Sequence, residues 1–238
     1  MAKVAAVPLV DRPEPCASHR LVHFLDSTVL NTHIVRYSDF RADETMARPR
    51  EFDTREALGQ ALDVFWAKGY EGASVCALMD AMGLSKSSFY DSFGSKRELF
   101  LKVIDRYAET SAAGFDRALT GEGSGRRAIA DMFAAIVEEA TCEAGRHGCF
   151  AANCAVENAG ADDRAGRRLG RFFKQFEGAI ETAVRRAQGQ GEIPADKDPT
   201  ALARFLMSSI NGIRVIARVD PDPAALRDVA RIALQALD

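Results

Sequence analysis

Hydroxyl, ammonium and carboxylate groups gather between residues 85 and 92, a segment that contains no glycine or proline. If this segment is a helix, Phe89 and Phe93 lie on one face and the polar residues on the other. Such a polar face can form hydrogen bonds with base edges in the major groove of DNA. The candidates for base contacts are Lys86, Ser87, Ser88, Asp91 and Ser92.

Two short helices joined by a tight turn must position this face, and the sequence marks their ends. Ser74 and Ser85 are favourable N-caps, because a serine hydroxyl can accept a hydrogen bond from an amide of the first helical turn. Gly83 lies between the helices and can adopt the positive φ of a tight turn. The turn is flanked by apolar residues, namely Leu78, Met79, Met82, Leu84, Phe89 and Phe93. The pattern predicts a helix-turn-helix DNA reader, and the alternative is a helical hairpin with no role beyond the protein surface.

Together with its neighbours, the segment resembles the N-terminal domain of the TetR/AcrR family of transcriptional regulators. The resemblance covers about residues 48–101, and the matching residues are Phe65, Gly69, Tyr70, Ser74, Gly83, Ser85, Lys86, Ser87, Ser88, Phe89, Tyr90, Phe93, Ser95, Lys96 and Leu99. The sequence departs from the family at Met79, where alanine is usual, and at Asp91, where histidine is common. The resemblance implies that Tyr90 and Lys96 contact phosphates.

Helix ends and a basic arm complete the predicted DNA-binding site. Ser74 and Ser95 each open a helix whose first amides can bind a phosphate oxygen, and Ser85 opens the base-reading helix. Arg48 and Arg50 precede the first predicted helix and form the arm.

The overall charge gives no support to DNA binding. The chain has 238 residues and a formal net charge of −3, so it exerts no long-range attraction on nucleic acid. Acidic and basic residues also balance within residues 46–97. This weak basic footprint leaves an alternative function, a small-molecule or redox sensor or interaction module without sequence-specific DNA binding.

Composition places the chain among globular proteins, with 47% hydrophobic and 27% charged residues. No stretch approaches the roughly 20 continuous apolar residues that span a bilayer. The N-terminus does not resemble a signal peptide, because Pro8 interrupts its short apolar run. We therefore expect a cytoplasmic protein without a membrane partner. The five cysteines show no spacing typical of structural disulfides.

Helical periodicity predicts an all-α fold with a three-helix DNA-binding head and a larger helical body. Residues 1–45 are rich in proline and mixed charge, and we expect an extension that is disordered or lies upstream of a true start at Met46; an extra helix over about 19–31 is the alternative. Residues 46–97 form the predicted head, and residues 98–238 the ligand-binding and dimerisation domain. Helices of the body are expected at about 126–143, 147–159, 162–188, 199–218 and 223–237.

The body is expected to provide a homodimer surface and an effector pocket. The resemblance implies that the last two helices form a four-helix bundle with a second copy, although their apolar stripes could also bury within one subunit. Candidates to line a pocket for an unknown small-molecule effector are Phe133, Phe150, Phe172, Phe173, Phe176 and Met207. The same side chains could fill a dry core, since periodicity does not separate lining from packing.

The segment 148–157, Gly-Cys-Phe-Ala-Ala-Asn-Cys-Ala-Val-Glu, resembles a pattern in one branch of the family. Some members of that branch use the first cysteine to sense electrophiles or oxidants, which makes Cys149 a candidate redox sensor. Arg146, His147 and the start of a helix could favour its thiolate. The alternative is a small buried cysteine with a packing role.

Catalytic and metal-binding signatures are missing from the sequence. It contains neither Gly-x-Ser-x-Gly nor His-Glu-x-x-His nor a nucleotide-binding fingerprint, and its cysteines do not have zinc spacing. We therefore predict no enzyme, no catalytic residue, no metal and no cofactor. The prediction is a homodimeric regulator, more consistent with a repressor, that binds a palindromic double-stranded DNA operator and is released by a small molecule or by thiol modification.

Overall fold

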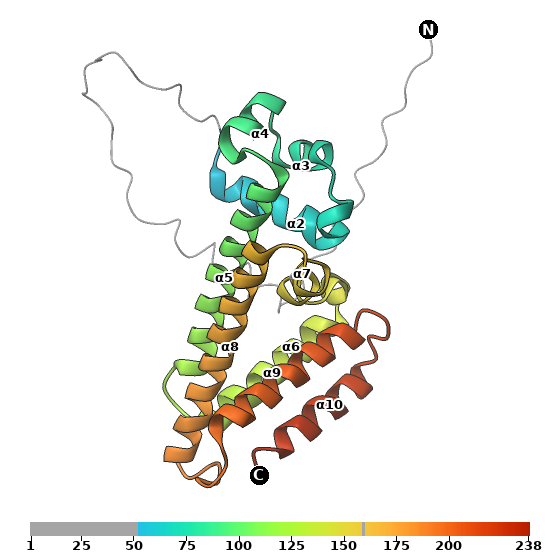
Figure 1. Ribbon diagram of the computed structural model, residues 1–238. Helices are drawn as coiled ribbons and strands as arrows, with labels where there is room; N and C mark the ends of the chain where they lie inside the picture. The colour runs from blue at the N-terminus through green and yellow to red at the C-terminus, as the bar shows by residue number, and fades with distance from the viewer. Residues whose placement is uncertain (1–51, 159) are drawn as a thin grey trace, which may run out of the picture.

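The computed structural model describes residues 52–158 and 160–238, and within this range every regular element is a helix (Figure 1). The elements are α2 (Thr54–Gly72), α3 (Val75–Met82), α4 (Lys86–Phe93), α5 (Lys96–Thr120), α6 (Gly125–Thr141), the 3-10 helix η1 (Glu143–His147), α7 (Phe150–Asn158), α8 (Asp163–Gly189), α9 (Pro199–Ile216) and α10 (Pro223–Gln235). The predicted all-α fold class is confirmed. The predictions for residues 1–45, Arg48 and Arg50 lie outside the described residues.

The helices of the head begin where the sequence predicts. The hydroxyls of Ser74, Ser85 and Ser95 accept hydrogen bonds from amides three residues later, at 3.1, 3.2 and 3.1 Å. Between α3 and α4, Gly83 has a φ of 61° and so adopts the left-handed conformation that glycine permits. These local signals fix the angle at which α4 leaves α3.

Helix α2 is broken near its end by Gly69, whose φ is 71°. The break frees the amides of the last turn, and those of Tyr70 and Glu71 each donate to a carboxylate oxygen of Glu157 in α7 at 2.9 Å. A carboxylate from the body therefore caps the end of a helix in the head.

The body is built around two long helices, α5 and α8, which run side by side away from the head (Figure 1). Helices α6 and α9 pack against α8, and α10 covers α6 and α9 at the outer edge. The short helix α7 packs against α2 and α8, between the head and the rest of the body.

Two clusters of buried side chains hold these helices together. The upper cluster joins α2–α5 with α7 and the first half of α8, and it includes Phe65, Phe100 and Phe150. The lower cluster joins α6 and the second half of α8 with α9 and α10. Because the upper cluster contains residues from both sides of position 97, the head shares a core with the adjoining part of the body.

Candidate DNA-binding and effector sites

The polar face of α4 is the candidate DNA-reading surface. Phe89 and Phe93 are buried, which turns the opposite face of the helix outward. The predicted base-contacting residues are exposed or half-buried on that face: Lys86, Ser87, Ser88, Asp91 and Ser92. Tyr90 is 43% exposed, and its ring packs edge-on against that of Phe89. This packing restricts the position of the Tyr90 hydroxyl.

Three serine hydroxyls meet at the N-terminal end of α4. The Oγ of Ser85 lies 3.0 Å from that of Ser87 and 2.9 Å from that of Ser88. The first amides of the helix lie at the same end, where the helix dipole is positive. This end can therefore donate hydrogen bonds to a phosphate oxygen or to an acceptor on a base edge.

Lys96 lies at the start of α5, beside the last turn of α2. Its Nζ is 4.5 Å from the centre of the Tyr70 ring and 3.5 Å from the carbonyl oxygen of Glu71. Ser95 caps the same helix, and Ser74 begins α3 shortly after the turn that Lys96 contacts. The neighbouring Arg97 points to the body instead, where it pairs with Asp162 at 2.6 Å.

A cavity of about 540 Å³ lies between α5, α6 and the loop that joins them. Its walls are largely apolar, with a polar end deep in the body. The residues that line it include Phe115, Met132 and Ile136 on the walls and Trp66, Tyr107, Glu139, Cys149 and Arg214 toward that end. Because Trp66 belongs to α2, the cavity reaches from the body to the first helix of the head.

The six residues predicted for the effector pocket lie outside this cavity. Phe150 is fully buried in the upper cluster, and Phe173 and Met207 are half-buried against the two clusters. Phe172 and Phe176 border a smaller hollow of about 350 Å³ beside α5. The structure does not bring the six side chains together around one space.

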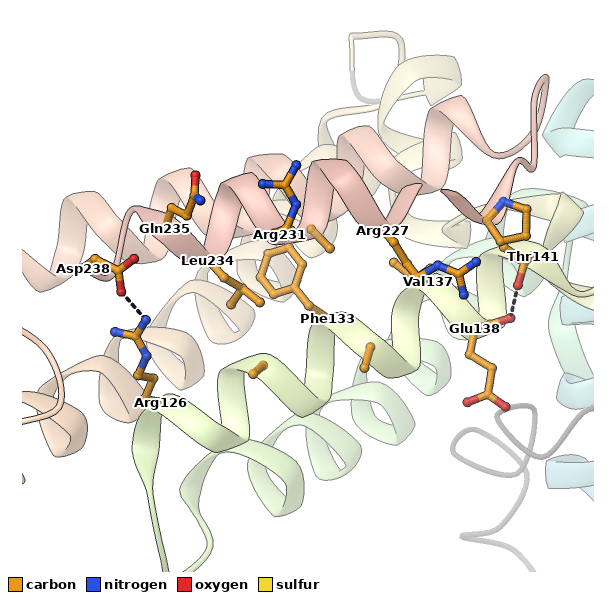
Figure 2. A pocket seen from close by; sticks show the side chains of 14 residues that line it. Arg126, Phe133, Val137, Glu138, Thr141, Arg227, Arg231, Leu234, Gln235 and Asp238 are labelled. Carbon is orange, nitrogen blue, oxygen red and sulfur yellow. Dashed lines mark hydrogen bonds and ion pairs between the residues drawn. The ribbon is translucent and has the colours of Figure 1, made fainter. Parts of the chain in front are cut away.

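Phe133 instead borders an open groove of about 610 Å³ between α6 and α10. Figure 2 shows Phe133 and Leu234 facing each other across this groove, with the Arg126–Asp238 ion pair at one end. All of its lining residues belong to α6, α10 and the chain end, so no side chain of the head borders it. The cavity next to Trp66 is therefore the better candidate for an effector whose binding changes the head.

Cys149 lies at the edge of that cavity and is 4% exposed. Its Sγ is 3.7 Å from the Oη of Tyr107. Arg146 and His147, which the sequence suggested as activating neighbours, are exposed at the surface. Tyr107, Glu139 and Arg214 share the cavity with the thiol. They come from distant segments of the chain, so their spacing in the sequence could not predict this arrangement.

Helix α7 connects this thiol to the head. At its N-terminal side, the Nε1 of Trp66 donates to the carbonyl oxygen of Gly148 at 3.2 Å. At its C-terminal side, Glu157 caps the broken end of α2. One short helix thus contacts the head at both ends.

Within residues 52–158 and 160–238, no group of three or more histidine, cysteine, aspartate or glutamate side chains could hold a metal ion. None of the helices described has the length and apolar character needed to cross a bilayer.

The head and the body of the chain each match a known protein family. The family described as "Bacterial regulatory proteins, tetR family" matches residues 57–103, and "Tetracyclin repressor-like, C-terminal domain" matches residues 123–233. The first match contains most of α2, all of α3 and α4, and the start of α5. The second contains α6 to α9 and most of α10.

Known proteins agree with this assignment. The uncharacterized HTH-type transcriptional regulator YezE of Bacillus subtilis (strain 168) is 36% identical over 81% of this chain and 100% of its own length. The HTH-type transcriptional repressor ComR of Escherichia coli (strain K12) is 35% identical over 80% of this chain and 90% of its own. A cysteine mutant of the TetR family regulator CifR, solved with 26-bp double-strand operator DNA, is 31% identical with a TM-score of 0.72, over 80% of this chain and 100% of that one. This chain therefore belongs to the TetR family of transcriptional regulators, DNA-binding proteins that are not enzymes.

Proposed function

We propose that the protein is a repressor that binds a palindromic operator as a homodimer and leaves it when the 540 Å³ cavity is filled or Cys149 is modified. The observation that carries the proposal is the position of this cavity, which has Trp66 of the head and Cys149, immediately before α7, on its wall. An effector bound there would change the contacts of α2 and of the start of α7, which support the DNA-binding surface. As a regulator of transcription, the protein would act in the cytoplasm.

The effector would be a compact molecule with an apolar body. The walls of the cavity are mainly carbon, and its deep end offers the Tyr107 hydroxyl, the Cys149 thiol and the Glu139–Arg214 ion pair. A ligand that fits this space would place one polar or electrophilic group at the deep end. Release follows only if the ligand binds more tightly to a form whose two heads no longer match the operator.

The dimer would form through α9 and α10. Apolar side chains remain exposed on these helices, among them Phe205 (47%), Val215 (56%), Ile216 (49%) and Ile232 (53%). A Cβ at Gly212 would meet no atom within 4 Å, so the backbone of α9 is open to close approach on this face. A two-fold dimer places two recognition helices on successive half-sites of one DNA face.

The proposal is tested by fluorescence anisotropy with DNA from upstream of the protein's own gene, or with a site selected from random duplexes. We expect salt-dependent binding that prefers this DNA over a scrambled duplex. A small electrophile such as iodoacetamide should then release the wild-type protein but not the Cys149→Ser variant. Cys76→Ser is the matched control, because Cys76 is exposed on α3 and away from the cavity lining.

Either of two results would overturn parts of this proposal. Equal affinity for operator and scrambled DNA would refute the proposal that the protein is a sequence-specific repressor. Release of the Cys149→Ser variant at the wild-type reagent concentration would place the responsive thiol elsewhere.

A further inference from the structure

The deep end of the cavity brings together ionisable groups from three helices and from the residue that precedes a fourth. Tyr107 comes from α5, Glu139 from α6, Arg214 from α9, and Cys149 immediately precedes α7. The Nη2 of Arg214 lies 2.9 Å from the Oε2 of Glu139, and their side chains are only 13% and 22% exposed. A thiol, a phenol and an ion pair therefore share a poorly hydrated space.

Two arginines line the cavity, and Arg214 is the buried one: its side chain is 13% exposed, whereas that of Arg127 is 76% exposed. Burial lowers the pKa of Arg214, but its neighbours, Glu139 foremost, raise it overall. The guanidinium thus stays charged in the cavity that it shares with the Cys149 thiol. A positive charge in a medium of low dielectric constant stabilises a nearby thiolate far more than it would in water.

Tyr107 supplies the second contact to the thiol. Burial raises the pKa of Tyr107 well above its ordinary range, and the neighbouring Cys149 adds to this effect. The phenol therefore keeps its proton and can donate a hydrogen bond to the sulfur, 3.7 Å away. Trp66 packs against the Tyr107 ring at 5.7 Å, which restricts the position of that hydroxyl.

The other buried cysteine, Cys154 in α7, has no such arrangement. Cys154 is 4% exposed, as Cys149 is, but it does not line the cavity. Burial raises the pKa of Cys154, and the charge on Glu157 raises it further. The two thiols are equally buried, but of the two Cys149 is the one that shares a cavity with Arg214 and Tyr107.

We propose that Arg214 and Tyr107 are positioning residues that activate Cys149, so that this thiol is the one that reacts with an electrophilic ligand in the cavity. The proton of the thiol passes to solvent, and the sulfur electron pair forms a bond to an electrophilic carbon. With iodoacetamide as the electrophile, the carbon–iodine bond breaks and iodide leaves. The inference rests on the proposed thiol response, but reactivity can be measured without DNA.

The test is the rate of alkylation of the full-length protein by iodoacetamide from about pH 6 to pH 10, resolved by mass spectrometry of the peptides that contain Cys149 and Cys154. In the wild-type protein, Cys149 should react faster than Cys154 near pH 7. Arg214→Met should slow Cys149 by about tenfold near pH 7, and the difference should close toward pH 10, where thiols ionise without assistance. Arg214→Lys keeps the charge and should remain within about threefold of wild type.

Two further variants separate electrostatics from packing. Glu139→Gln removes the competing carboxylate, so Cys149 should react faster near neutral pH and its rate profile should move to lower pH. Arg185→Met is the matched control, because Arg185 forms an exposed ion pair with Glu181 on α8, and its rates should equal those of wild type. If Arg214→Met does not fold, as judged by its thermal midpoint, the Glu139→Gln profile decides the question.

The inference is overturned if Arg214→Met reacts at the wild-type rate, or is slowed equally at every pH, since the latter result indicates altered access. It is also overturned if Glu139→Gln leaves the profile unchanged. Anisotropy on the same alkylated samples tests the proposed function separately. An alkylated protein that keeps its operator affinity would refute the thiol response while the activation by Arg214 stands.

Discussion

Lys96 shows how one residue can serve both the fold and the DNA. In the free protein its ammonium group lies over the ring of Tyr70 and within 3.5 Å of a backbone carbonyl of the preceding helix. These contacts hold the charge next to the helix starts at Ser74 and Ser95, where a phosphate would also meet free amides. A phosphate contact at this place sets the register of the head without reading the sequence.

We expect Lys96→Ala to weaken binding to operator and scrambled DNA by similar factors. Because each subunit loses one phosphate contact, the slope of log K against log salt should fall by about one per subunit, or about two for the dimer. The measurement is fluorescence anisotropy over a salt series, with Lys174→Ala as control for removal of an exposed lysine from α8. A changed base preference at unchanged affinity would place Lys96 among the base-reading residues instead.

At the scale of elements, the broken end of α2 is the joint between head and body. Gly69 combines a positive φ with close approach, because a Cβ at this position would lie 2.9 Å from the Oε2 of Glu157. Only glycine combines free access to this positive φ with room for the Glu157 carboxylate. The carboxylate can therefore reach the two free amides only as long as residue 69 has no side chain.

Gly69→Ala should lower the free energy of unfolding by about 1–3 kcal/mol, because a φ of 71° with a ψ of 174° is a backbone conformation that only glycine adopts readily. Displacement of Glu157 from its two amides would add to this loss. The control is Gly59→Ala in the same helix, where a Cβ would meet no atom within 4 Å and alanine is the better helix former. Urea unfolding measures both variants, and equal stabilities would contradict the role assigned to Gly69.

A second contact between helices, formed by ion pairs at the junction of α5 and α8, is expected to depend on pH. Arg97 and Arg164 pair across the junction of α5 and α8 with Asp162 and Glu98, at 2.6 and 3.0 Å. The hydrogen bond from Arg97 lowers the pKa of Asp162, and that from Arg164 lowers the pKa of Glu98. Since the folded state binds protons more weakly than the unfolded chain, this stabilisation is present above about pH 4 and is lost as the pH falls further.

The variant Asp162→Asn isolates the charge, because asparagine is also a good N-cap for α8. Wild type should be more stable than this variant at pH 7, and the difference should shrink as the pH is lowered below about 4. Asp162→Ala should lose about 1 kcal/mol more at every pH, since it removes the cap as well. Urea unfolding at several pH values provides the measurement, and a difference between wild type and Asp162→Asn that does not vary with pH would refute the assignment.

At the scale of the whole molecule, the apolar face of α9 and α10 is the surface through which we expect the protein to assemble. The lower cluster already buries the opposite faces of these helices, so within the part of the chain that the structure describes the residues of this face stay exposed, and a second copy would bury them. The same pairing would set the distance between the two heads. Assembly and operator recognition are therefore expected to depend on one surface.

A charge placed on this face should separate the subunits. We expect Phe205→Asp or Ile232→Glu to shift the protein toward monomer and to reduce operator affinity by tenfold or more, since each half-site would be bound alone. Light scattering after gel filtration measures the mass, with Gln175→Glu on the exposed side of α8 as control. A wild-type protein that is monomeric at micromolar concentration would contradict this prediction.

The sequence by itself determined the features that depend on neighbouring residues. The start of α4 at Ser85, the turn at Gly83 and the buried phenylalanines at 89 and 93 follow from caps, backbone freedom and helical period, and the structure confirms them. Helix starts at Asp198-Pro199 and Asp222-Pro223 are local signals of the same kind. Such signals act within one or two turns of helix and need no knowledge of the rest of the fold.

Only the tertiary structure decided which distant side chains meet. Tyr107, Glu139 and Arg214 surround Cys149 because α5, α6 and α9 converge there, and no spacing along the chain relates these residues. The six apolar residues predicted for the pocket lie elsewhere for the same reason. A helical period shows which face of a helix is apolar, but the packing of the neighbouring helices determines whether that face meets another side chain or an empty space.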